Sequence, residues 1–204
     1  MDYLINNWDR VWPRILEHLT VSGLSLVVAL VIALPLGLLL NRKHTLASPV
    51  LVVLGVIYSI PSLALLAILV TFVGIGLWPA VIALTAYALV VLVRNTMVGF
   101  DSVNPAVKEA ATGMGMSGGQ MLWRIEVPLA LPVVVAGIRI AALSTIALTA
   151  VAGLAVGAGG LGQILKEGIN NPSKLYAGVI SIAAIAILTD AVFRLLERTV
   201  RVPR

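Results

Sequence analysis

The side chains best suited to chemistry lie in one polar stretch, residues 109–128, between long apolar segments. Its landmarks are Glu109, Ala110, Ala111, Gly115, Ile125 and Pro128. No catalytic constellation accompanies them, because the chain has no Walker motif, no Ser/His/Asp set and no carboxylate cluster inside its apolar segments. The chain has no cysteine, and its two histidines lack metal-ligand spacing. Chemistry that needs a nucleotide or a metal must therefore come from another chain.

The residues from Asn104 onwards predict two short helices joined by a tight turn. Asn104-Pro105 is typical of a helix start, because Asn can cap and Pro suits the first helical position. We expect this helix to run over about 105–112 and to end at Gly113 or Gly115, since glycine suits a left-handed cap. The following Ser-Gly-Gly-Gln run has capping-box spacing for a second helix. Such a compact unit can transmit a push, whereas a floppy loop cannot.

The order EAA, three residues, Gly, nine residues, Ile, one residue, Val-Pro resembles the cytoplasmic loop by which permease subunits of binding-protein-dependent ABC importers engage their ATPase. Val127 stands where that family usually has Leu, which is a mild departure. The resemblance implies that residues 109–111 and Gly115 sit in a groove on the ATPase. The alanines would permit close approach, and Glu109 would supply a charged hydrogen bond. The alternative is an ordinary solvated amphipathic loop.

Other segments resemble permeases of osmoprotectant importers, which carry glycine betaine, choline, carnitine and related quaternary ammonium compounds. They are IPSLALLA at 60–67, GIG at 74–76, PAVIAL at 79–84, RNT at 94–96 and GAGGLG at 157–162. This resemblance extends from about residue 19 to residue 190. It implies an all-α membrane protein with five transmembrane helices and a cytoplasmic EAA coupling loop, a MetI-like permease architecture. Related permeases move other solutes, such as amino acids or other amines, so that reading stays open.

The resemblance also implies partners. Two permease subunits, identical or related, would form the pathway between them, because five helices do not easily enclose one alone. Two ATPase subunits would bind ATP and Mg, and a solute-binding protein would dock on the outside. Aromatic cages recognise quaternary ammonium ions, and aromatic residues make up only 5% of this chain. We therefore expect selectivity to reside mainly in the binding protein.

Composition independently indicates a membrane protein. Of 204 residues, 60% are hydrophobic and 11% charged, and the mean hydropathy is +1.06. The net charge of +5 comes from scattered basic residues, so a nucleic-acid partner is not expected. A self-sufficient channel or carrier would need polar spans or internal repeats, and neither is evident. A membrane-embedded enzyme is disfavoured by the missing catalytic groups.

Five apolar stretches are long enough to span a bilayer as helices. We expect them at 19–40, 49–73, 77–94, 133–156 and 175–196. Residues 1–18 should form a short interfacial segment outside, with two Trp residues at headgroup level. Residues 19–196 should form the permease domain, with the EAA loop at 101–132, and 197–204 a basic cytoplasmic tail.

The basic residues predict the orientation in a prokaryotic plasma (inner) membrane. With the N-terminus outside, the inner side receives nine: Arg42, Lys43, Arg94, Lys108, Arg124, Arg194, Arg198, Arg201 and Arg204. The outer side receives four: Arg10, Arg14, Lys166 and Lys174. The positive-inside rule therefore places the EAA loop and the C-terminus in the cytoplasm.

Two groups of polar residues are candidates for the pathway or its gate. Pro61 removes a backbone hydrogen bond within the second stretch, and Tyr58, Ser59 and Ser62 flank it. The bend can line a pathway or merely serve packing. Thr145 and Thr149 share one helix face, and they can line the pathway or bond back to their own helix.

Two charges lie inside apolar stretches, Arg139 and Asp190. Ionisable groups in a membrane are costly and usually paired. We expect a structural ion pair between them, with Asp190–Arg194 as the local alternative at i,i+4.

Topology can be tested in this cysteine-free chain with single introduced cysteines. In intact cells, Ser173→Cys should react with an impermeant thiol reagent, whereas Ser117→Cys should react only after permeabilisation. The reverse pattern would overturn the orientation.

Overall fold

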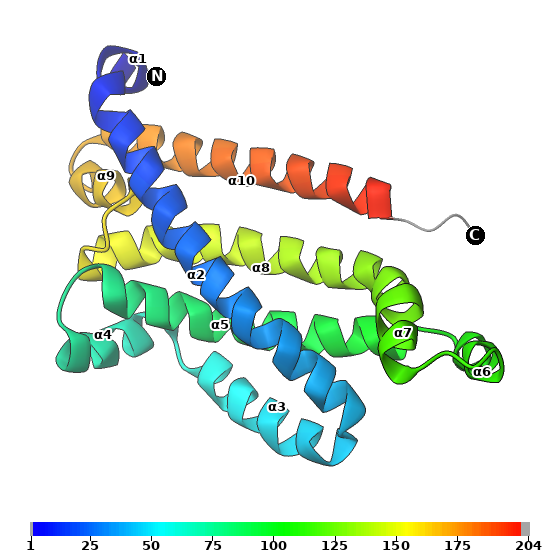
Figure 1. Ribbon diagram of the computed structural model, residues 1–204. Coiled ribbons are helices and arrows are strands. Elements are labelled where there is room, and N and C mark those ends of the chain that lie inside the picture. Colours follow the sequence, from blue (N-terminus) through cyan, green and yellow to red (C-terminus); the bar gives the residue numbers. More distant parts are fainter. Residues whose placement is uncertain (1, 201–204) are drawn as a thin grey trace.

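The computed structural model describes residues 2–200, and within this range the chain contains helices and no strand, as expected (Figure 1). The helices are α1 (Asp2–Asn6), α2 (Trp8–Arg42), α3 (His44–Ser59), α4 (Ser62–Val73), α5 (Leu77–Asp101), α6 (Pro105–Gly113), α7 (Gly118–Met121), the π-helix η1 (Leu122–Glu126), α8 (Val127–Val156), α9 (Leu161–Gly168) and α10 (Pro172–Val200).

Four helical segments are long and apolar enough to cross a membrane: α2, α5, the run 118–156 that includes α8, and α10. The pair α3–α4 makes a fifth span if it is counted as one. The stretch 49–73, expected as one span interrupted by Pro61, lies in two helices, because α3 and α4 meet at a bend of 95°. The physical cause is Pro61, which forces Ile60 into extended backbone (φ −68°, ψ 128°) and so ends α3.

The first long helix starts earlier than expected. α2 continues through residue 18 without a break, and only α1 precedes it as a separate turn. Val11 and His18 are buried, because this part of α2 packs against other helices of the chain. Trp8 and Trp12 stack on its exposed side, with ring centroids 5.9 Å apart. At the other terminus α10 extends to Val200, and the expected basic tail from 201 to 204 lies outside the described residues.

The core lies where α5 packs between α2 and α8. Glycine lets these helices approach closely. A methyl group added at Gly37 of α2 would lie 2.6 Å from Thr96 Cβ of α5, and one at Gly137 of α8 would lie 2.3 Å from Asn95 Cβ. Lipid tails are as apolar as leucine, so helices in a membrane associate through such close packing.

The glycine-rich segment after α8 forms a tight turn that carries the chain into α9. Gly157, Gly159 and Gly160 all have positive φ, a conformation that glycine adopts without strain. The Gly160 N–H donates to the Glu17 carboxylate at 2.8 Å. This contact ties the start of α9 to α2.

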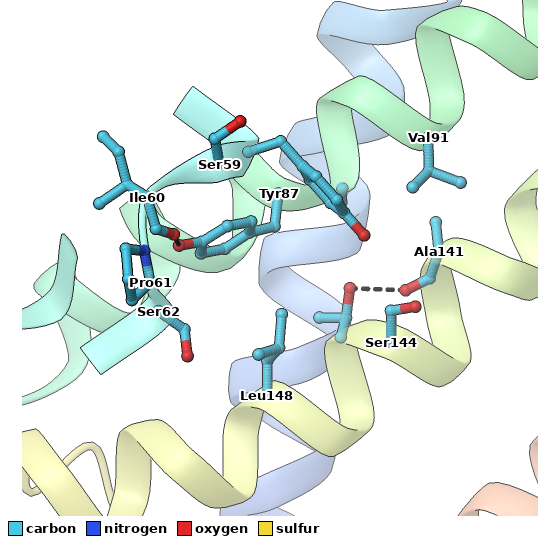
Figure 2. Close-up of a pocket in the computed structure, with 12 residues that line it drawn as sticks. Ser59, Ile60, Pro61, Ser62, Tyr87, Val91, Ala141, Ser144 and Leu148 are labelled. Atoms are coloured by element: carbon cyan, nitrogen blue, oxygen red, sulfur yellow. Dashed lines mark hydrogen bonds between the residues drawn. The ribbon is translucent and has the colours of Figure 1, made fainter. Parts of the chain in front are cut away.

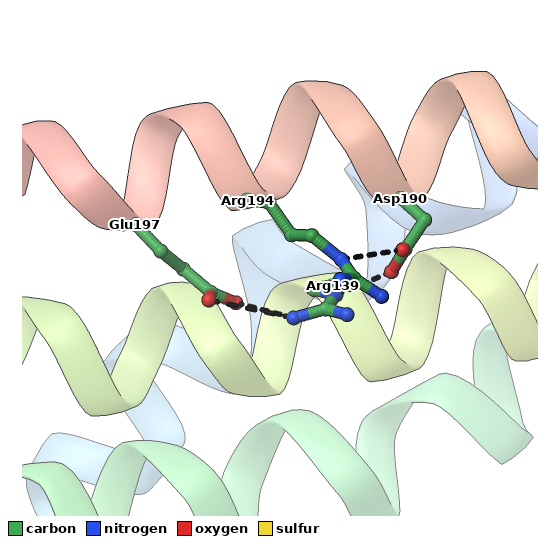
Figure 3. A network of polar contacts seen from close by, with 4 residues as sticks. All are labelled: Arg139, Asp190, Arg194 and Glu197. Atoms are coloured by element: carbon green, nitrogen blue, oxygen red, sulfur yellow. Dashed lines mark hydrogen bonds and ion pairs between the residues drawn. The ribbon is translucent and has the colours of Figure 1, made fainter.

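The charges inside the apolar helices form one cluster between α8 and α10 (Figure 3). Arg139 Nε of α8 donates to Asp190 Oδ1 at 2.6 Å, and its Nη1 lies 3.3 Å from Glu197 Oε1. Asp190 also accepts from Arg194 Nε at 2.7 Å. The interhelical pair and the local pair therefore coexist, and Glu197 adds a partner that the sequence reading did not include.

This cluster predicts a non-additive double mutant. Arg139→Met and Asp190→Asn should each lower the melting temperature in detergent, because each removes the shorter interhelical partner of the remaining charge and leaves it only Arg194 or Glu197. The double variant should lose less than the sum of the two losses. Arg194→Met is the control, since this exposed side chain should matter little. Strictly additive losses would show that the pair contributes no coupling.

Candidate functional site

One end of the bundle carries a projecting unit, residues 105–121, which we call the knob. It consists of α6, a turn and α7, and α6 extends beyond the ends of α5 and α8 (Figure 1). The Asn104 side chain accepts from Ala106 N at 2.9 Å, and Pro105 occupies the first turn. The expected cap and the expected start of this helix are both present.

The turn of the knob is held by local interactions. α6 ends at Gly113, and Gly115 adopts φ +78°, which L side chains rarely adopt. Ser117 and Gln120 then form a complete capping box at the start of α7. These contacts fix the local geometry of the knob at both helix ends.

The knob presents part of the EAA segment to solvent. Glu109, Ala110 and Gly115 are exposed, whereas Ala111 is only 1% exposed. Ala111 therefore seats α6 against its own chain and does not belong to the outer surface. Ile125 is half-buried and Pro128 is exposed where the chain enters α8.

The knob joins α8 through a π-helical turn. In η1 the Val127 N–H donates to the Leu122 carbonyl, five residues back, directly before Pro128. Helical structure then continues in α8, which contains Pro132. The two prolines thus lie within one helical run, and the wide turn accommodates the missing donor of Pro128.

Glu126 is a charged residue at this junction that the sequence reading did not single out. It lies in η1, is 1% exposed, and contacts Arg42 of α2 and Lys108 of α6. One signal was available, namely an acid flanked by Ile125 and Val127 where the sequence turns apolar.

A second feature is a cavity of about 320 Å³ between the α3–α4 break, α5 and α8 (Figure 2). Its lining residues are Tyr58, Ser59, Ile60, Pro61, Ser62, Tyr87, Ala88, Val91, Ala141, Ser144, Thr145 and Leu148. This volume falls within the range of small-molecule sites. The structure thus brings Tyr58, Ser59, Pro61 and Ser62 together with Thr145, and it adds Tyr87 and Ser144.

Two tyrosine rings form one wall of the cavity. Tyr58 of α3 and Tyr87 of α5 make an edge-to-face contact with centroids 5.7 Å apart. The Tyr87 hydroxyl donates to the Ile60 carbonyl, which the break leaves without a helical partner (Figure 2). The break is therefore held by a side chain of another helix.

The two threonines of α8 differ in position. Thr145 lines the cavity, while Thr149 is fully buried and does not. Both hydroxyls donate to carbonyls four residues back, Ala141 and Thr145. The back-bonding alternative therefore applies to both, and only Thr145 remains next to the cavity.

Neither region offers a metal site. Among residues 2–200, no group of three His, Asp or Glu side chains is arranged to hold a metal ion.

The chain is similar to several curated permease proteins over almost its whole length. The chain is 39% identical over 202 residues to the carnitine transport permease protein OpuCD of Listeria monocytogenes, covering 98% of this chain and 90% of that protein. It is 35% identical over 204 residues to the glycine betaine/carnitine/choline transport system permease protein OpuCB of Bacillus subtilis, covering 98% and 93%. It is 38% identical over 195 residues to the osmoprotectant import permease protein OsmW of Salmonella typhimurium, covering 92% and 90%.

Solved structures show the same architecture. The fold matches an inward-facing form of the MetNI methionine ABC transporter with a TM-score of 0.84 and 26% identity, over 94% of this chain and 96% of that chain. An amino acid ABC transporter with histidines matches in fold alone, with a TM-score of 0.73 and 16% identity, over 96% and 94%. Residues 25–202 match the family described as binding-protein-dependent transport system inner membrane component, and this chain belongs to that family.

Proposed function

We propose that this chain is the transmembrane permease subunit of an ABC importer for a quaternary ammonium osmoprotectant such as glycine betaine, choline or carnitine. The full-length similarity to permeases named for these solutes supports the solute class. The observation that carries the importer mechanism is the knob, whose exposed Glu109 and left-handed Gly115 form a rigid projection. ATP and Mg belong to the partner ATPase, as in this family.

The partners follow from this role. Two permease subunits, this chain with a second copy or a paralogue, form the pathway, and two ATPase subunits bind at the knob end. A solute-binding protein docks at the opposite end, and lipid surrounds the apolar helices. The protein is a multi-pass protein of the inner membrane, with the N-terminus outside and the knob in the cytoplasm.

The surface of the knob fits a docking role. Met114, at the end of α6, is 71% exposed, and Val107 is also exposed. Methionine is enriched in protein–protein interfaces, and a partner docked on the knob would cover both side chains. Glu109 lies between them in sequence and supplies a charge-assisted hydrogen bond to the ATPase. Ala110 leaves room for close approach, while the buried Ala111 fixes α6 in place.

The cavity beside the α3–α4 break belongs to the translocation pathway in this proposal. A quaternary ammonium ion has no hydrogen-bond donor, so it binds to aromatic faces and to carbonyl oxygens. Tyr58 and Tyr87 offer aromatic faces. The C-terminal end of α3 offers carbonyl oxygens, and it carries the negative end of the helix dipole. Ser59, Ser62, Ser144 and Thr145 add hydroxyls, and Pro61 keeps the break in place.

Coupling is tested by changing the knob. Glu109→Lys should reverse the docking charge, and Gly115→Asp should strain the turn, so both should abolish ATP hydrolysis stimulated by glycine betaine, choline or carnitine with the binding protein. Gly113→Asp is the matched control, because Gly113 also faces open space but does not have positive φ.

The measurement is stimulated hydrolysis by the complex reconstituted in lipid, with membrane insertion checked for each variant. Normal stimulation in both Glu109→Lys and Gly115→Asp would contradict the coupling role. Stimulation by an amino acid and by none of the three osmoprotectants would contradict the solute class.

The cavity predicts an aromatic requirement at position 58. Tyr58 is 51% exposed, so replacing it should not disrupt the core. Tyr58→Phe should retain uptake, whereas Tyr58→Leu should lower it between about 2-fold and 30-fold, the equivalent of a cation–π contact of about 0.5–2 kcal/mol. Val53→Ala is the control, because Val53 is an exposed α3 residue that does not line the cavity. Equal uptake by the Phe and Leu variants would show that the ring does not contact the solute.

A further inference from the structure

The Glu126 carboxylate lies at the base of the knob, where the π-helical turn meets α8. At 1% exposure it has little access to water. A buried carboxylate is costly unless cations and hydrogen bonds compensate for the lost hydration. The groups that compensate this carboxylate therefore stabilise the junction between the knob and α8.

Each carboxylate oxygen is engaged by a different part of the chain. Oε2 accepts from an Arg42 guanidinium nitrogen at the last turn of α2. Oε1 lies 3.3 Å from Lys108 Nζ, on the residue that precedes Glu109 in α6. One buried group thus joins the end of a long helix, the knob and the start of α8.

The contacts on either side make this junction a mechanical link. α6 makes few contacts with the other helices, and the Lys108–Glu126 pair ties it directly to η1 at the start of α8. Next to Arg42, the Asn41 side chain donates to Asp101 at the end of α5 at 2.6 Å. The ends of α2 and α5 are therefore tied together one residue from the Arg42–Glu126 pair.

We propose that Glu126, with Arg42 and Lys108, forms a relay that transmits movement of the knob to the ends of α2 and α5. This inference rests on the proposed function, because it assigns the knob to the ATPase. Glu126 is a positioning residue that acts through α6 and contacts neither nucleotide nor solute. When the ATPase displaces α6, Lys108 moves with it and pulls the Glu126 carboxylate. The carboxylate in turn pulls Arg42, and Arg42 moves the end of α2.

Removing the ties one at a time separates a relay from a stabilising contact. Lys108→Met cuts the tie to α6 and leaves Arg42 on the carboxylate, while Arg42→Met cuts the tie to α2 and leaves Lys108. Each should lower binding-protein-stimulated ATP hydrolysis and uptake about tenfold, a typical size for coupling between sites. Arg124→Met is the matched control: Arg124 is exposed, two residues from Glu126, and has no ion pair within residues 2–200.

The triple variant Arg42→Met, Lys108→Met, Glu126→Met removes all three charges together. Glu126 is the buried member of this cluster, whereas the Arg42 and Lys108 side chains are 48% and 30% exposed. Replacing a buried charge together with its partners by apolar residues of similar size is often neutral for stability or stabilising. The triple variant should therefore melt near the temperature of the unmodified complex and retain its ATPase subunits, yet show the same loss of stimulation. Recovery of normal stimulation in the triple variant would overturn the relay and leave a purely structural role.

The single variants decide the question if the triple variant does not fold. Normal stimulation in both Lys108→Met and Arg42→Met overturns the relay. If Glu109→Lys and Gly115→Asp still abolish stimulation in that case, the proposed function stands without the relay. If those two variants also keep normal stimulation, the coupling role of the knob itself has failed.

Discussion

The packing of α5 between α2 and α8 is the interaction on which both functional regions depend. α5 is the most buried of the four long apolar helices, since 61% of the residues in its most apolar part are buried. Gly37 of α2 and Gly137 of α8 let these helices approach α5 closely, and such close packing holds helices together in a membrane. The same helix carries Tyr87 to the cavity and Asp101 to the knob end. Movement of α5 relative to its neighbours therefore affects both regions together.

The break between α3 and α4 follows from the same constraint. A carbonyl without a partner is unfavourable at membrane depth, so irregular backbone persists there only where protein or water satisfies it. Tyr87 satisfies the Ile60 carbonyl beside a cavity whose lining includes several hydroxyl groups. The bend that Pro61 imposes is thus stabilised from α5, and Ser62, Ser144 and Thr145 contribute hydroxyl groups to the cavity lining.

Charge is distributed in two different ways along the bundle. Between α8 and α10 the charges are partly exposed and form a four-residue cluster around Arg139 and Asp190. At the base of the knob a single carboxylate, Glu126, is fully buried and shared between two cations. The first arrangement joins the long helices α8 and α10, whereas the second brings three segments together on one side chain.

The helical class, the approximate spans and the local structure of the knob could be predicted from residue patterns alone. Asn104, Gly115 and the Ser117 capping box act within a few residues, and apolar runs are read directly against the thickness of a bilayer. The size of the bend after Ile60, the burial of Ala111 and the partners of Glu126 came from the packing of the whole chain. These depend on which helix faces meet across the fold, and Arg42 and Glu126 are 84 residues apart in the chain. Local patterns fix the elements, but contacts at such separations exist only once the elements have packed.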